Sequence, residues 1–332
     1  MFFIMFLVLS LFIALGFYSV IGSVLKGLNK NYKSGKVRII RGTVAVLLSV
    51  ICYLFRSLMI FALYLFIIYG FFVILRPLLR IIFKGLKNKK FYKVLSKIYK
   101  IGLVQILLVV LVLGYGVYNM NNPIKTEYTV TSDKIKSNFK VVFLSDVHYG
   151  TVQKPEVLKE AVKEINSQNP DLVILGGDIL EEGTTKEKMK ECFKILGGIR
   201  TRCGKYYIYG NHDKQTYSKN PAYTADEIKY ELALHEIFPL KDQTVEIRND
   251  LLLVGREDVS AVYTKGKRAE INELIGKNQD KFIIVADHQP KDFERNAASG
   301  GDLQRSVHSH AGQIIPMCTV AIMLGLMKQY GL

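Results

Sequence analysis

The sequence predicts an α/β domain preceded by an all-α membrane region. Three runs of β-forming residues, 141–144, 172–175 and 206–209, are each followed at once by side chains that bind metals. About 30 residues separate one run from the next, which is enough for a strand, a crossover helix and a return loop. The three strands can therefore lie parallel, with their carboxyl ends at one edge of a sheet, where α/β proteins bind ligands.

The membrane region is indicated by apolar runs at 1–25, 42–55, 58–75 and 101–118. A span needs about 20 apolar residues, and the second run by itself is shorter than this. The first run has no basic residue at its start and exceeds the apolar part of a signal peptide, so we expect it to be retained. These runs predict about four transmembrane helices.

Basic residues around these runs predict their orientation. Residues 26–41 carry six Lys or Arg, and residues 76–100 carry nine. Both segments favour the cytoplasm, so an even number of spans must separate them. We therefore interpret 42–75 as two helices with a tight turn near Arg56 and Ser57, rather than as one long helix. The prediction is a multi-pass protein of the cell membrane, with the soluble domain on the extracytoplasmic face.

The net charge of +16 belongs entirely to the membrane region. Residues 1–126 contain 17 Lys or Arg and no acid, whereas the rest of the chain contains 28 Lys or Arg and 29 acids. Basic residues beside apolar runs are typical of proteins that contact anionic lipids. We expect the lipid bilayer as a partner and expect no nucleic acid, which would need the excess charge on the soluble part. A transporter more often has ionisable residues inside its spans, whereas Arg56 here lies at the boundary between two runs.

Three segments follow from these patterns. Residues 1–118 form the membrane region, 119–138 form a linker that includes an edge strand at 126–131, and 139–332 form the soluble domain. Within that domain, hydrophobic periodicity and capping residues predict further elements. They are helices over 155–165, 186–196, 225–235, 268–275 and 291–298, a hairpin of 244–248 with 251–254, and a buried strand over 282–286.

The histidines of the soluble domain cluster after strand-like segments. His235 is the exception, and we interpret it as a residue of a helix face. The others join two aspartates and an asparagine to give eight residues of ligand type: Asp146, His148, Asp178, Asn211, His212, His288, His308 and His310. Mixed imidazole and carboxylate ligands suit Mn, Fe or Zn rather than Ca. Because eight such residues exceed the needs of one tetrahedral ion, we expect two divalent metal ions.

The order of these motifs resembles the calcineurin-like metallophosphoesterases, and most closely their membrane-anchored bacterial branch. The motifs are Asp146-Val147-His148, Gly177-Asp178, Gly210-Asn211-His212-Asp213, the lone His288, and His308-Ser309-His310. The match covers roughly residues 139–316. Five elements in order are far more specific than any one of them. The resemblance implies a two-layer β-sandwich flanked by helices.

The resemblance also implies a role for each residue. One ion would be held by Asp146, His148 and His310, the second by Asn211, His288 and His308, and Asp178 would bridge both. His212 would lie next to the phosphate, as general acid or as a stabiliser of the leaving oxygen, and Asp213 would orient it. Two ions about 3.5–4 Å apart can bridge a hydroxide and clamp phosphoryl oxygens for in-line attack.

The sequence departs from the family pattern near its end. Val307 stands where the family has Gly before the paired histidines, and Ala311 where it usually has Gly after them. A β-branched residue cannot easily adopt the positive φ that Gly allows. The family also continues for several tens of residues, so we expect the strands that close the sandwich to be missing and the domain to be truncated. Residues 317–326 are expected to form an apolar helix.

These observations predict a membrane-anchored phosphoesterase that hydrolyses phosphomonoesters or phosphodiesters by attack of a metal-bridged hydroxide. The membrane anchor suggests a lipid-linked or envelope substrate, and the only basis for this suggestion is the location of the domain at the membrane. The alternative is a degenerate, non-catalytic membrane protein that keeps part of the metal site, which Val307, Ala311 and the short C-terminus favour. A metal count separates the two hypotheses.

Other residues have two interpretations each. Cys192 and Cys203 form a disulfide if the domain is exported, or are a helix-face residue and a loop thiol. Asp287 is a partner of the metal-binding His288 or a cap of the strand end. Arg256 faces phosphate or makes a surface ion pair.

Overall fold

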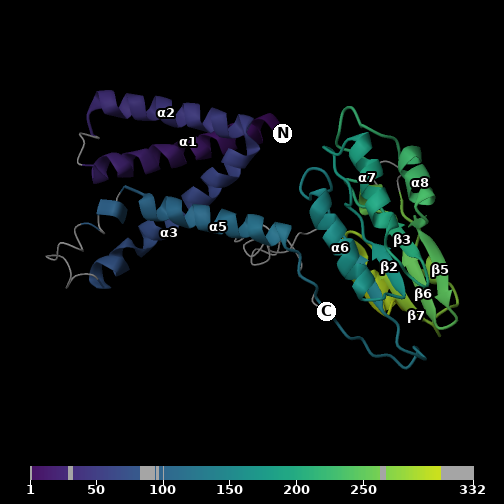
Figure 1. Ribbon diagram of the computed structural model, residues 1–332. Helices are drawn as coiled ribbons and strands as arrows, with labels where there is room; N and C mark the ends of the chain where they lie inside the picture. The colour runs from purple at the N-terminus through teal and green to yellow at the C-terminus, as the bar shows by residue number, and fades with distance from the viewer. Residues whose placement is uncertain are drawn as a thin grey trace. The chain divides into compact units, whose positions relative to one another are not determined.

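The computed structural model describes residues 2–28, 33–82, 94, 97–99, 101–261 and 267–307. The chain divides into two compact units, Met1–Asn119 and Met120–Leu332. Figure 1 shows that long helices make up the first unit, whereas the second combines strands with helices. Residues 308–332 lie outside the described part, and with them His308, His310, Ala311, the apolar helix over 317–326 and the expectation of missing strands.

The first unit consists of helices α1 (Phe2–Gly27), α2 (Gly35–Leu54), α3 (Arg56–Ile82) and α5 (Leu103–Asn121). Each contains a stretch long and apolar enough to cross a membrane, and the four together define a multi-pass membrane region. Helix α2 ends at Leu54 and α3 begins at Arg56, so 42–75 forms two helices, as predicted. The break falls at Phe55, whose backbone is extended.

Small residues and one arginine shape the packing of these helices. Gly16 of α1 lies close to the Phe66 ring of α3. A Cβ added at this position would lie only 2.6 Å from the ring. Arg41 of α2 donates from Nε to the Tyr18 carbonyl at 2.8 Å, and its guanidinium lies 3.6 Å from the centre of the Tyr18 ring. These contacts satisfy a charge that would otherwise be costly beside apolar helices.

The described residues of the second unit form two four-stranded sheets. The first has the order β1 (Val141–Leu144), β2 (Leu172–Leu175), β3 (Lys205–Ile208) and β4 (Ile237–Leu240), and every pair is parallel. The second has the order β5 (Gln243–Arg248), β6 (Leu251–Gly255), β7 (Phe282–Ala286) and β8 (Leu303–Arg305). The β5–β6 pair is the predicted antiparallel hairpin, and the other pairs of this sheet are parallel.

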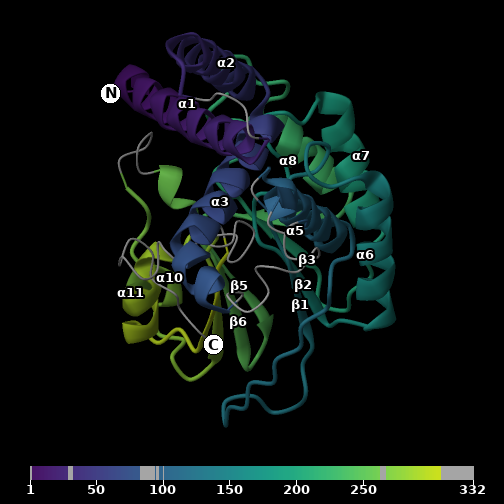
Figure 2. The same ribbon diagram turned by 90° about the vertical axis from the view of Figure 1, so that its left-hand side faces the viewer.

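Helices cover the outer faces of both sheets. Helices α6 (Pro155–Ser167), α7 (Lys186–Gly197) and α8 (Ala225–Leu234) lie on the first sheet (Figure 1). The short helices α10 (Ile271–Ile275) and α11 (Phe293–Ala298) lie beside the second (Figure 2). The sequence starts these helices as predicted: Pro155 is in the first turn of α6, and Thr224 and Glu227 form the capping box of α8.

Buried side chains of β2 alternate between two cores. Val173 and Leu175 pack against the helices, whereas Leu172 and Ile174 pack between the sheets. Since both faces are covered, the strand is apolar throughout, as in other parallel sheets. The two-layer β-sandwich flanked by helices is therefore confirmed.

Several local predictions were wrong. Residues 126–131 form no strand, because they are exposed and pair with no neighbouring strand among the described residues. The helix predicted over 268–275 is shorter, since it begins at Ile271, whereas the one over 291–298 is confirmed as a 3₁₀ turn at 290–292 followed by α11. Strand β4 was not predicted, since it contains Pro239. Proline lacks the amide of a central strand but is tolerated here because β4 is an edge strand.

Candidate metal centre

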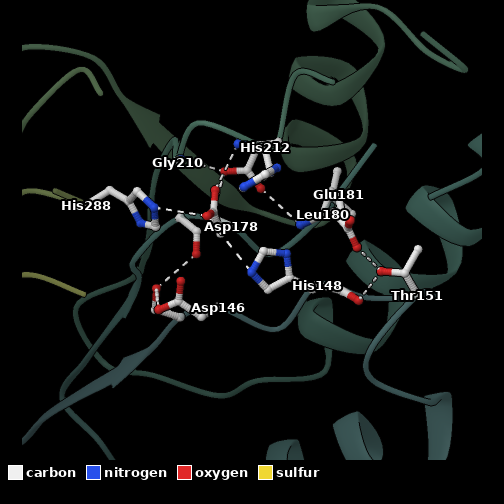
Figure 3. A network of polar contacts seen from close by, with 12 residues as sticks. Asp146, His148, Thr151, Asp178, Leu180, Glu181, Gly210, His212 and His288 are labelled. Carbon is white, nitrogen blue, oxygen red and sulfur yellow. Dashed lines mark hydrogen bonds and ion pairs between the residues drawn. The ribbon is translucent and has the colours of Figure 1, made fainter. Parts of the chain in front are cut away.

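The carboxyl ends of the strands bring three ligand-type side chains together. Asp146 follows β1, Asp178 follows β2 and His288 follows β7. One ligand atom from each lies within 4.8 Å of the others (Figure 3). His148 joins them, with Nε2 at 4.0 Å from Asp178 Oδ2. Asp146, His148 and Asp178 converge because β1 and β2 are parallel and end at the same edge of the first sheet, whereas His288 comes from β7 of the second sheet.

The backbone is strained at three of these positions. Asp146, His148 and Asp178 have φ values of 51°, 46° and 50°. This left-handed region is uncommon for residues other than Gly, and it costs about 1–3 kcal/mol per residue. Two hydrogen bonds between the loops hold the conformation: the Asp146 amide donates to the Gly177 carbonyl and the His148 amide to the Asp178 carbonyl, both at 3.0 Å. Strain held in this way is typical of a functional site.

Asp178 is at the centre of the cluster and is fully buried. Its Oδ1 accepts a hydrogen bond from the His212 amide at 2.9 Å, and its Oδ2 lies 3.1 Å from His288 Nε2. Burial alone raises the pKa of Asp178, but the contacts with His288 and the His212 amide bring it below the ordinary value. The Asp178 carboxylate is therefore ionised, which suits it to bind a cation.

His288 is oriented by the backbone of the neighbouring loop. Its Nδ1 lies 2.9 Å from the Gly176 carbonyl, so Nδ1 carries a proton and donates to that oxygen. The other ring nitrogen, Nε2, points at Asp178. Burial lowers the pKa of His288, but the Asp178 carboxylate outweighs this effect and raises it to about 9. A ring fixed through Nδ1 and directed through Nε2 is the usual arrangement of a metal-binding histidine.

Asn211 provides an independent indication of a cation. The residue is buried, and its Oδ1 accepts no hydrogen bond from any residue that the structure describes. A buried acceptor without a partner is costly, and coordination of a cation would remove that cost. Carboxylates, imidazoles and an amide oxygen at one sheet edge form a donor set that fits Mn, Fe or Zn.

The His212 ring lies beside this cluster and has a carboxylate partner. Its Nδ1 is 2.5 Å from Glu182 Oε2, and its ring centre is 5.4 Å from that of His148. Burial lowers the pKa of His212, but Glu182 and Asp178 raise it above the ordinary value. Sequence reasoning missed Glu182, although its position four residues after Asp178, in the same loop, was a usable signal.

Asp213 does not contact the His212 ring in the way that the resemblance implied. Its fully buried carboxylate accepts hydrogen bonds from the amides of Asp178, Leu180 and Gly210, at 3.0, 3.0 and 2.6 Å. Burial and the nearby Asp178 charge raise the pKa of Asp213 to about 6. Asp213 therefore joins the loops after β2 and β3, and Glu182 takes the place at the ring.

The structure shows Arg256 in a buried ion pair rather than a surface one, and it gives Asp287 a partner that neither interpretation named. Arg256 is buried and donates to Asp242, Asn296 and the Ala269 carbonyl, so it makes an ion pair and structural hydrogen bonds. Asp287 accepts a hydrogen bond from Arg268 Nη2 at 2.8 Å. Both residues belong to a buried network beside the second sheet.

Two further predictions concern Cys192, Cys203 and Val307. Both cysteines are free, and burial raises the pKa of the Cys192 thiol, so the disulfide is not formed. Val307 is the last described residue, and it is absent from the described residues with positive φ. Its amide donates to the His288 carbonyl at 3.0 Å. The valine therefore introduces no strain at its own position, and one argument for a degenerate site is removed.

A buried aspartate surrounded by imidazoles, a second carboxylate and an amide makes this cluster a candidate metal centre at the strand ends of an α/β-sandwich domain. The model of the calcineurin-like phosphoesterase family matches residues 139–313. This match covers more than half of the chain, and the chain belongs to that family.

Curated relatives are similar over the same region. An uncharacterized metallophosphoesterase of Helicobacter pylori is 29% identical over 210 residues, which cover 61% of this chain and 54% of the relative. A transmembrane protein with metallophosphoesterase domain from Danio rerio is 26% identical over 227 residues, which cover 63% of this chain and 50% of the relative. The uncharacterized metallophosphoesterase YkuE of Bacillus subtilis is 29% identical over 210 residues, which cover 60% of this chain and 70% of the relative. The chain spans about half the length of the first two.

Proposed function

We propose that this chain is a membrane-anchored phosphoesterase that hydrolyses phosphomonoesters or phosphodiesters with two divalent cations. The observation that carries the proposal is the grouping of Asp146, Asp178 and His288 within 4.8 Å at the carboxyl edge of the sheets. His148 lies in the same loop as Asp146, Asn211 lies in the loop after β3, and His308 and His310 complete the proposed ligand set. Family membership supports the class of reaction.

The residues of the site divide into proposed metal ligands and one proposed proton donor. Asp178 is proposed to be the shared ligand, because it is the buried carboxylate that the other groups surround. When bound, two divalent cations polarise phosphoryl oxygens and lower the pKa of water. His212 is proposed to hold a proton at Nε2 and to donate it to the leaving oxygen. Glu182 keeps the ring protonated and fixes its direction through Nδ1.

The proposal is tested with the purified chain in detergent. We expect about two metal ions per chain by mass spectrometry and Mn-dependent hydrolysis of a para-nitrophenyl phosphodiester or monoester. A chelator should remove both the metal and the activity, and added Mn should restore them. A chain that retains no metal after Mn loading and hydrolyses neither ester would instead support the degenerate, non-catalytic alternative.

Replacing Glu182 should slow the reaction without removing metal. In Glu182→Gln the ring of His212 loses its charged partner, so we expect kcat to fall about 10²-fold, the lower end for a misplaced general acid. Steady-state kinetics and metal content are the measurements. Glu181→Gln is the matched control, because the Glu181 carboxylate contacts the Thr151 hydroxyl and not the ring. Loss of metal in Glu182→Gln would show that Glu182 is a ligand instead.

We further propose that the domain faces outward and acts on a lipid-linked or envelope substrate. The support is the charge pattern, with nine basic residues in 76–100 and none of the acids before residue 127. Protease added to intact cells should then remove the soluble domain. Cleavage that occurs only after the cells are permeabilised would place the domain in the cytoplasm.

A further inference from the structure

Gln215 is a buried amide that the proposed chemistry does not use. It follows β3 in the loop that also carries His212, and its side chain is almost completely buried. Its backbone has a φ of 51°, in the left-handed region. A residue other than Gly stays in that conformation when the surrounding structure holds it there, which is frequent near functional sites.

The side chain of Gln215 binds the loop after β2. Its Nε2 donates to the carbonyls of Glu181, Glu182 and Thr184, at 3.0, 3.2 and 2.7 Å. Its Oε1 accepts from the Ala222 amide at 2.6 Å. Both ends of the amide are therefore satisfied, and a residue with only acceptors or only carbons could not make the same contacts.

The same residue also contacts the backbone of His212. The Gln215 amide donates to the His212 carbonyl at 2.8 Å. One residue thus touches the main chain of both His212 and Glu182, whose side chains meet at 2.5 Å. The two loops come from different strands, and Gln215 sets the distance between them. Thr184 supports the loop from its other side, through a hydrogen bond from its hydroxyl to the Tyr149 carbonyl.

We propose that Gln215 is a positioning residue that holds the His212–Glu182 pair in place for protonation of the leaving group. The inference rests on the proposed function, and it concerns the proton donor rather than the metal ligands. A residue that acts by positioning a general acid affects esters with poor leaving groups more than esters with good ones. A poor leaving group needs the proton from the acid, and a good one does not. A nitrophenolate leaves almost unaided, whereas a phenolate with no nitro group depends on the acid.

The test compares Gln215→Asn with the wild-type chain on two phosphate esters that differ only in the nitro group of the leaving phenol. Asparagine keeps the amide and tolerates positive φ, but it is one methylene shorter and cannot reach the three carbonyls. We expect kcat to fall about 30-fold or more on the phenyl ester and less than about 3-fold on the nitrophenyl ester. Metal content and KM should stay close to wild type. Gln243→Glu, at an exposed site, is the control for a change at a glutamine.

The outcomes separate the inference from the proposed function. Equal losses on both esters, with metal retained, would mean that Gln215 has a structural role only and would overturn the inference. A wild-type chain with metal but no turnover of either ester would contradict the proposed function itself. In a His212→Asn background, Gln215→Asn should have no further effect on the phenyl ester, and an additive loss there would also overturn the inference.

A variant that fails to fold does not end the test. Gln215→Glu has the same shape as the wild-type residue but places a carboxylate against three carbonyls. Circular dichroism and metal content show whether Gln215→Asn, Gln215→Glu or both variants are folded. A folded Gln215→Glu chain with the wild-type ratio of phenyl to nitrophenyl turnover would overturn the inference.

Discussion

Asp178→Asn should abolish metal binding and turnover together. The substitution preserves the size of the side chain but removes the charge that faces His288 at 3.1 Å and His148 at 4.0 Å. Asp178 is fully buried, and removal of one partner of a buried charged pair costs about 3–5 kcal/mol. A loss of this size corresponds to a fall of about 10²- to 5 × 10³-fold in metal affinity, and turnover should fall at least as far.

Isothermal titration of the metal-free chain with Mn measures the binding, and the nitrophenyl ester assay measures the turnover. Asp250→Asn is the matched control, because this buried aspartate lies in the turn before β6 and contacts Arg248 and the Lys136 amide. It should lose stability but keep its metal. Wild-type metal affinity in Asp178→Asn would remove Asp178 from the centre of the proposed site.

Gly210→Ala should disrupt the site through the backbone, with every ligand still present. A Cβ on Gly210 would lie 2.1 Å from Asp178 Oδ1 and 2.5 Å from the Asp178 amide nitrogen. The aspartate cannot give way easily, because its amide is bonded to Asp213 and its Oδ1 to the His212 amide. Overpacking of this kind typically costs about 1–3 kcal/mol. We expect most of that cost to appear as lost metal binding.

The measurements are Mn affinity, turnover and the melting temperature of the metal-free chain. Gly198→Ala is the matched control, because Gly198 has a φ of −69° and the nearest atom to an added Cβ is the Ile195 carbonyl oxygen at 3.2 Å. That variant should bind metal normally. If Gly210→Ala bound Mn as tightly as the wild type, the close contact between the loops after β2 and β3 would not be needed for the site.

Much of the site could be predicted because its ligands are attached to regular elements. Asp146 and Asp178 follow neighbouring parallel strands that end at one edge of the first sheet, so their proximity followed from the local sequence pattern. His288 follows a strand of the second sheet, and only the packing of the two sheets brings it to Asp178. The four apolar helices were readable for the same reason, since length and hydropathy suffice to identify a candidate span.

The partners of polar side chains could not be predicted in this way. Glu182 rather than Asp213 contacts the His212 ring. Which of the two carboxylates reaches the ring depends on the path of the loop that carries it. Those paths depend on hydrogen bonds between residues about 30 positions apart, such as the one from the Leu180 amide to Asp213.

The sequence by itself thus determined most of the strands and helices, the four apolar helices and the strand ends that carry the candidate ligands, because these depend on local periodicity and residue type. Only the tertiary structure decided which carboxylate orients His212, which backbone positions adopt positive φ, and how Gln215 connects two loops. The physical reason is that a buried polar group must find its partners wherever the fold places them.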